Sequence, residues 1–158
     1  MIISSFIYVN LKKGAIEMER IYSKVEPDLL LLVIGRHADI DKSRTDFSPA
    51  HEYMQVSAKK LSTGTSFLPH KHNKILRTSD ITQEAWVFLS GKVTARFWDI
   101  DDSIIFETDL GAGDSAVVFR AGHSFEVLED NTILYEFKTG PYYGQEKDKT
   151  YILEGESE

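Results

Sequence analysis

Two histidines and a glutamate in the middle of the chain are spaced in a way that suits metal coordination. His70 and His72 are two residues apart, so in an extended strand both imidazoles point to the same face. Glu84 opens the next strand-like run, where a hairpin would return its carboxylate to them, and His123 opens a later run. Three imidazoles and one carboxylate suit a divalent transition metal (Fe, Mn, Ni, Co, Cu or Zn) better than Mg or Ca. The alternative is a pair of surface histidines with no metal.

The elements that must position these side chains are predicted to be short β-strands. The chain carries runs rich in Val, Ile, Phe, Tyr, Trp and Thr, separated by turn-like residues such as Ser90-Gly91. These runs cover residues 53–61, 65–72, 84–90, 92–99, 103–110, 115–120, 123–129 and 132–138, with a buried strand at 29–35, an edge strand at 2–9 and a short helix at 15–26. The pattern predicts an all-β sandwich or barrel.

Length, charge and cysteine content narrow the class of protein. The chain has 158 residues, which favours one domain, and its 42% hydrophobic and 27% charged residues are typical of a soluble globular protein. A net charge of −7 without a long basic tract argues against nucleic acid and anionic membranes as partners. The lack of cysteine excludes disulfides, zinc–thiolate sites and cysteine nucleophiles, and it fits a reducing cytoplasm. We expect no membrane span and no signal peptide.

The spacing of the candidate ligands resembles the first motif of the cupin superfamily, in which a glycine, a His-x-His pair, a glutamate and a second glycine follow one another. That motif is matched here by Gly64, His70, His72, Glu84 and Gly91, with both outer intervals intact. Gly113-Asp114 and His123 fill the two ends of the second cupin motif. The resemblance implies a cupin double-stranded β-helix, or jelly-roll barrel, that holds one metal ion on His70, His72, Glu84 and His123.

On this resemblance the chain is a single cupin domain over residues 1–158. An N-terminal extension (1–52) would add strands and the short helix, the barrel core would span about 53–138, and a C-terminal tail (139–158) would follow.

Two features depart from the cupin pattern. Eleven residues separate His72 from Glu84, where the family has three or four. The insert over 73–82 is either a lid, with Arg77 available to an anionic substrate, or a passive longer loop. The second motif lacks its proline and is one residue short, although Ala121-Gly122 is small enough for a tight turn before His123.

A narrower resemblance suggests a substrate class. Residues 43–55 and 132–142 are similar to segments of small WbuC-type cupin-fold metalloproteins associated with surface-polysaccharide genes. The resemblance implies a metal-dependent protein that acts on a sugar or nucleotide-sugar through isomerase- or epimerase-type Lewis-acid chemistry. The alternatives are a non-catalytic metal- or sugar-binding module, an Fe(II) dioxygenase-type cupin, and a metal-independent epimerase, against which the complete ligand set argues. The fold does not choose among them, so whether the protein is an enzyme stays open.

Four side chains outside the ligand set are candidates for binding a small molecule such as a sugar or a carboxylate: Arg44, Gln55, Arg77 and Tyr142. For Arg44 the alternative is local ion pairing, for Gln55 a place on the solvated side of its strand, and for Tyr142 a role in capping the core. By analogy with cupins we also expect a homodimer, with the apolar run 2–9 as an exchanged or augmenting edge strand.

Overall fold

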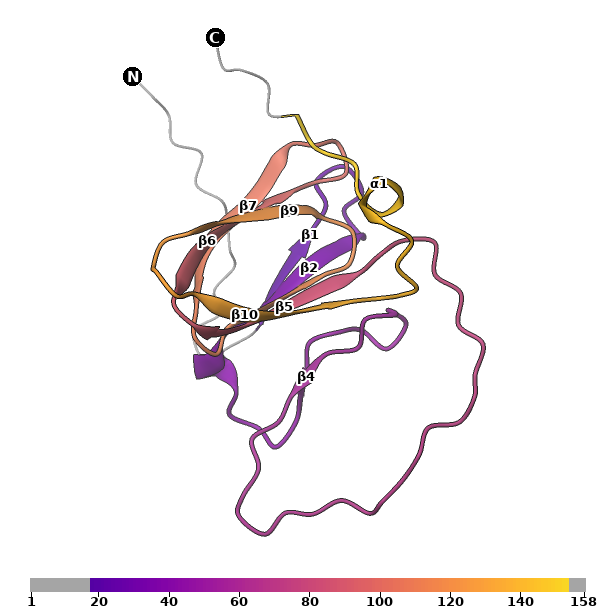
Figure 1. The fold of residues 1–158 in the computed structure, drawn as a ribbon, viewed down its shortest axis with the longest axis vertical. Coiled ribbons are helices and arrows are strands. Elements are labelled where there is room, and N and C mark those ends of the chain that lie inside the picture. Colours follow the sequence, from indigo (N-terminus) through magenta and orange to yellow (C-terminus); the bar gives the residue numbers. More distant parts are fainter. Residues whose placement is uncertain (1–17, 154–158) are drawn as a thin grey trace.

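The computed structural model describes residues 18–153, whose regular secondary structure is almost wholly antiparallel strand (Figure 1). The strands are β1 (Glu19–Tyr22), β2 (Leu30–Gly35), β3 (Thr45–Asp46), β4 (Ser57–Ala58), β5 (Glu84–Ser90), β6 (Lys92–Trp98), β7 (Ile104–Gly111), β8 (Ser115–Val118), β9 (Gly122–Val127) and β10 (Ile133–Lys138). A 3-10 turn, η1 (His37–Asp39), and a one-turn helix, α1 (Gln145–Asp148), complete the list. The predicted all-β class is confirmed.

Two sheets face each other and enclose the core. One has five strands in the order β1-β2-β8-β5-β10, and the other has three in the order β7-β6-β9. Phe88 of the first sheet and Phe97 of the second lie fully buried in the same apolar cluster between them. A second cluster, around Phe47 and Phe119, covers the outer face of the five-stranded sheet. Strand β2 is therefore buried at every position, because it has a neighbour on each side and an apolar layer on each face.

Most of the strands expected from the sequence are present. The runs at 84–90, 92–99, 103–110, 115–120, 123–129 and 132–138 correspond to β5 through β10, and the buried strand expected at 29–35 is β2. Gly91 makes the turn between β5 and β6 with φ of 76°, and a Cβ there would lie 2.1 Å from the Thr132 hydroxyl oxygen. This glycine of the first motif is thus required by the turn itself.

The expected helix at 15–26 is wrong over its described part. Residues 19–22 form β1, which pairs with β2 through Glu19↔Ile34 and Arg20↔Val33, and residues 27–28 make a turn. A weak local helical pattern gives way to a strand because the neighbouring β2 offers a complete hydrogen-bonding edge. The edge strand expected at 2–9, and with it the expected route to a dimer, lies outside the described residues.

The predicted strand at 65–72 is also wrong, and the strand at 53–61 shrinks to β4. Between β4 and β5 the chain runs as an extended segment in which every residue from 59 to 81 is exposed. We call residues 59–81 the arm. Figure 1 shows it swinging out in a wide loop, in magenta, away from the two facing sheets. The arm lacks strand structure because no strand of the described residues lies beside it to complete its hydrogen bonds.

The sandwich is open on one flank. Strands β9 and β10 end their respective sheets, and each has a single hydrogen-bonded neighbour among the described strands. In the described part of the chain the two sheets therefore do not close into a barrel, and the jelly roll stays an expectation.

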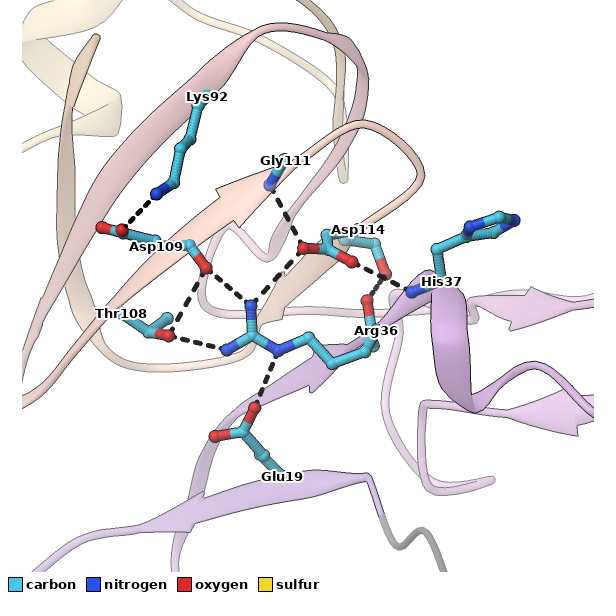
Figure 2. Close-up of polar contacts among 10 residues, drawn as sticks. Glu19, Arg36, His37, Lys92, Thr108, Asp109, Gly111 and Asp114 are labelled. Carbon is cyan, nitrogen blue, oxygen red and sulfur yellow. Dashed lines mark hydrogen bonds and ion pairs between the residues drawn. The ribbon is translucent and has the colours of Figure 1, made fainter. Parts of the chain in front are cut away.

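The opposite flank is held by polar contacts around Arg36, which follows β2 directly (Figure 2). Its guanidinium pairs with Glu19 of β1 at 2.9 Å and donates 2.6 Å hydrogen bonds to the Thr108 hydroxyl and the Asp109 carbonyl of β7. Asp114 adds a longer ion pair with Arg36 at 3.5 Å and accepts from the backbone N–H of Gly111 at 3.1 Å. One side chain thus ties the edge strand of one sheet to the edge strand of the other.

Candidate functional site

Glu84 lies at the start of β5 on the inner face of the five-stranded sheet and is buried, with 5% of its surface exposed. One carboxylate oxygen accepts a 2.6 Å hydrogen bond from the indole N–H of Trp86. The other lies 3.0 Å from Nζ of Lys138, which is directly opposite Glu84 in the pairing of β5 with β10, and 3.6 Å from Nε2 of His123. Two strands of one sheet and one strand of the other thus contribute to a single polar cluster at the open flank. We call Glu84, Trp86, His123 and Lys138 the Glu84 cluster.

The electrostatics of the cluster favour its charged form. Burial by itself raises the pKa of Glu84, but the hydrogen bonds and charges of His123 and Lys138, with the Trp86 hydrogen bond, outweigh it and lower the pKa to about 2. Burial also acts to lower the pKa of Lys138, yet Glu84 and Glu136 raise it above the usual lysine value. The cluster therefore holds a carboxylate and an ammonium throughout the neutral range.

His123 is oriented by its own strand and by aromatic neighbours. Its Nδ1 lies 3.1 Å from the carbonyl oxygen of Ala121, which can only accept, so Nδ1 carries the proton. Nε2 then faces Glu84, where it serves as a donor when protonated and as a metal ligand when neutral. The Trp86 ring packs against the imidazole edge-to-face with 5.2 Å between centroids. This packing fixes the orientation of the ring.

The other two predicted ligands lie elsewhere. His70 and His72 are on the exposed arm, with their ring centroids 5.6 Å apart, and Nδ1 of His70 lies 2.9 Å from the Leu68 carbonyl oxygen. The structure therefore assembles two half-sets: Glu84 with His123, and His70 with His72. Over residues 18–153, no three or more His, Asp or Glu side chains gather closely enough to hold a metal ion.

The four predicted ligands are of types that bind transition metals, but in this conformation only two of them, Glu84 and His123, lie together at the cluster. Imidazole and carboxylate are usual partners of Fe, Mn, Co, Ni, Cu and Zn, and Glu84 and His123 already face each other. Both Glu84 oxygens are engaged, one by Trp86 and one by Lys138. Binding of one metal ion by all four ligands would require the arm to move to the Glu84 cluster and Lys138 to release the Glu84 oxygen that it contacts. The four-ligand set remains a prediction.

The four side chains predicted to bind a small molecule do not converge on the cluster. Arg44 forms an exposed ion pair with Asp46 at 2.6 Å, which is the local pairing considered as its alternative. The Gln55 side chain donates to the backbone carbonyls of Pro49 and Glu52, so it stabilises its own loop. Arg77 lies exposed on the arm, and Tyr142 is 65% exposed beyond β10. Each is available to solvent, and their ligand-binding roles stay predictions.

Lys138 is the member of the cluster that sequence reasoning missed. It closes the run 132–138, where a terminal lysine is usually a solvated strand end. Its position opposite Glu84 depends on the register between β5 and β10, which local pattern does not reveal. The tail brings Asp148 to within 3.9 Å of the same ammonium, and Thr82 donates a 2.6 Å hydrogen bond to Asp148. The C-terminal segment thus folds over this end of the sandwich.

A second buried polar cluster was also missed. Glu52, 5% exposed, accepts a 2.7 Å bond from Arg120 and a 2.6 Å bond from the Gln83 amide, whose own oxygen accepts from the backbone N–H of Met54 at 2.7 Å. We call Glu52, Gln83 and Arg120 the Glu52 cluster. It lies between the outer face of the five-stranded sheet and the segment that joins β3 and β4, which carries Glu52. No spacing in the sequence links these residues, which are brought together by tertiary packing alone.

The fold and the site are the basis on which similarity to known proteins can be judged. Comparison with protein-family models, curated proteins and solved structures finds no match. Neither helical element in the described residues is long and apolar enough to cross a membrane. The Glu84 cluster and the spacing of the candidate ligands are the features of this chain that bear on its function.

Proposed function

We propose that this chain is a cupin-type protein that binds one divalent transition metal through His70, His72, Glu84 and His123 and acts on a small oxygen-rich molecule, most simply a sugar or nucleotide-sugar. The observation that supports it is the meeting of Glu84 and His123. These two predicted ligands come from different sheets, and the buried carboxylate of Glu84 lies 3.6 Å from the half-buried imidazole of His123 beside an open flank.

The residues of the Glu84 cluster have distinct roles in this proposal. Glu84 and His123 would hold the ion with the two arm histidines, and the ion would supply Lewis-acid polarisation of a carbonyl or enediol oxygen. Trp86 orients the Glu84 carboxylate through its indole N–H and excludes water. Lys138, whose raised pKa keeps it cationic, is placed to bind a negatively charged oxygen of the substrate once the metal has taken its share of Glu84.

A non-catalytic binding module is the second candidate, and the pairing within the Glu84 cluster favours it. Glu84 and Lys138 neutralise each other at 3.0 Å, and Trp86 occupies the second carboxylate oxygen. Because both Glu84 oxygens already have partners within the cluster, the cluster is stable without a metal ion, and a binding module needs no catalytic step. On this alternative Lys138 would bind a sugar hydroxyl or a carboxylate with no chemical step.

Metal content tests the proposal. Protein purified without chelator is expected to carry about one transition-metal ion per chain by elemental analysis, and Glu84→Gln and His123→Ala are expected to lose most of it. His37→Ala is the matched control, because His37 is an exposed histidine outside the ligand set. Wild-type protein that holds no metal and takes none up from solutions of Fe(II), Mn, Co, Ni, Cu or Zn ions would contradict the proposal.

A further inference from the structure

The arm makes few contacts with the rest of the described chain, and all of its residues are exposed. Four of its large apolar side chains are strongly exposed: Phe67 (60%), Leu68 (87%), Ile75 (64%) and Leu76 (92%). Its recorded polar and ring contacts are local, such as Lys59 over the Phe67 ring and His70 beside His72. Monomeric proteins seldom leave so many large apolar groups together in water, so the arm has the character of one side of an interface.

The charge of the arm differs in sign from that of the whole chain. The arm carries one acidic residue, Asp80, and five basic ones: Lys59, Lys60, Lys71, Lys74 and Arg77. The chain as a whole carries a net charge of −7, so the remainder is strongly acidic. The arm is therefore complementary to the general surface of another copy of the same chain.

The open flank of the sandwich has the complementary properties. Strand β9 has an unpaired edge, and the end of β9 and the turn after it expose Glu126, Glu129 and Asp130 beside Val127 (52% exposed) and Leu128 (48%). An unpaired edge with apolar and acidic side chains is suited to an incoming extended segment that is apolar and basic.

The arm does not lie at this flank in its own chain. Figure 1 shows the arm on one side of the β5–β10 pair, with β6, β7 and β9 on the other. A second copy presents both an arm and an open flank, so one two-fold exchange serves both chains at once. A standard interface uses about 20–30 residues from each partner, which an arm spanning residues 59–81 supplies almost alone.

We infer that the arm docks along the free edge of β9 in a second copy of this chain, and that it delivers His70 and His72 to the Glu84 and His123 of that copy. The delivery of the histidines rests on the proposed function, whereas the exchange itself does not. Each site is then composite: one chain provides the fixed half on β5 and β9, and its partner provides the half on the arm. A chain that lacks a partner has incomplete sites.

Molar mass in solution tests the exchange without reference to a metal. We expect wild-type protein at twice the chain mass of 18.0 kDa and the Leu68→Ser/Leu76→Ser variant at the mass of one chain, because both leucines are exposed until a partner covers them. Leu153→Ser, at a position 90% exposed in the tail, is the matched control and is expected to stay dimeric. A monomeric wild type overturns the inference, and so does an arm variant that remains a dimer.

Complementation between two inactive chains tests the delivery of the histidines. One chain carries His70→Ala/His72→Ala and the other Glu84→Gln/His123→Ala, and the mixed dimer is purified through a different tag on each chain. Exchange assembles one complete ligand set in the pair, so about one metal ion per mixed dimer is expected, against two in the wild-type dimer. An arm that folds back on its own chain assembles none.

The outcomes separate the two proposals. A mixed dimer without metal, beside a wild-type dimer that holds two ions, overturns the delivery of the histidines and leaves the proposed function intact. A wild-type dimer that binds no metal overturns the proposed function, while the molar mass of the arm variant still decides the exchange.

Discussion

Two buried carboxylates lie on opposite faces of the same sheet, and they are held in different ways. Glu52 on the outer face is 5% exposed and bonded to Arg120 and Gln83 beneath a covering segment. Glu84 on the inner face is equally buried and lies at the open flank. Its imidazole partner, His123, is half-buried and comes from the facing sheet, whereas the imidazole near Glu52 is that of the exposed neighbour His51, 3.4 Å away. Gln83 directly precedes β5 and Glu84 opens it, so their side chains point to opposite faces of the sheet and one reaches each cluster.

The difference separates a structural ion pair from a candidate site. Glu52 is held by a guanidinium and an amide, neither of which ligates a transition metal, and its one imidazole partner, His51 at 3.4 Å, is 77% exposed. The partners of Glu84 are an imidazole and an amine beside an unpaired strand edge. In such a cluster a metal ion or a substrate can replace the amine as the partner of the carboxylate. Equal burial of two carboxylates therefore does not imply equal function. Their partners, and whether an open strand edge lies beside them, distinguish the two.

The largest effect on stability is expected at Glu52. Glu52→Gln turns an amide N–H₂ towards a donor and leaves the half-buried Arg120 without its carboxylate, so the free energy of unfolding should fall by about 2–4 kcal/mol. Glu84→Gln should lose less, about 1–2 kcal/mol, because Lys138 keeps Glu136 at 3.3 Å and Asp148 at 3.9 Å. Urea unfolding of the metal-free proteins measures both.

Glu129→Gln at the exposed turn after β9 serves as the control and should stay within about 0.5 kcal/mol of wild type. Equal losses at Glu52 and Glu84 would remove the contrast drawn between the two clusters.

The next effect concerns Lys138. Lys138→Met removes the charged donor of a buried carboxylate, so metal-free protein should lose about 1–2 kcal/mol of unfolding free energy. Saturation with the bound metal should shrink that loss, because the ion brings positive charge to the same carboxylate. Urea unfolding with and without metal measures the difference, with the exposed Lys147→Met as control. A loss that is the same in both conditions would show that the metal does not reach Glu84.

The smallest effect is expected at Asp99, a third buried carboxylate and a reference for both clusters. Burial alone raises its pKa, but hydrogen bonds from the Ser23 hydroxyl and from the backbone N–H groups of Lys24 (2.7 Å) and Ile100 (2.8 Å) outweigh it and lower the pKa. Its contribution to stability is therefore present above the unfolded pKa of about 3.9 and is lost as the pH falls below it.

The Asp99→Asn variant should accordingly lose about 1 kcal/mol at pH 7, and the gap to wild type should narrow towards pH 3. Metal should leave it unchanged. A gap that widens with falling pH would reverse the sign assigned to this carboxylate.

Local patterning predicted the part of the fold in which neighbouring runs pair with each other. The strands from β5 to β7 are joined by short turns, so alternation and turn residues were enough to predict them. Residues 19–22 were misassigned to a helix because their strand depends on pairing with β2, and residues 65–72 were misassigned to a strand that has no partner in the described chain. A strand needs its partner, which a local window does not contain.

The site was predictable to the same extent. The spacing of the motif led to Glu84 and His123, which the structure brings together from two sheets. Lys138 was not predictable, because its place opposite Glu84 follows from the register of two strands far apart in sequence. Glu52 and Arg120 were not predictable either, since only tertiary packing brings them together.

Anomalous X-ray diffraction from crystals of the metal-loaded protein tests the central claim most directly. We predict one anomalous peak per chain, bounded by Glu84 and His123 of one chain and by two imidazoles, those of His70 and His72, that a second chain supplies. The absence of a peak at the Glu84 cluster in metal-loaded crystals, or an ion bound away from Glu84 and His123, would contradict the account.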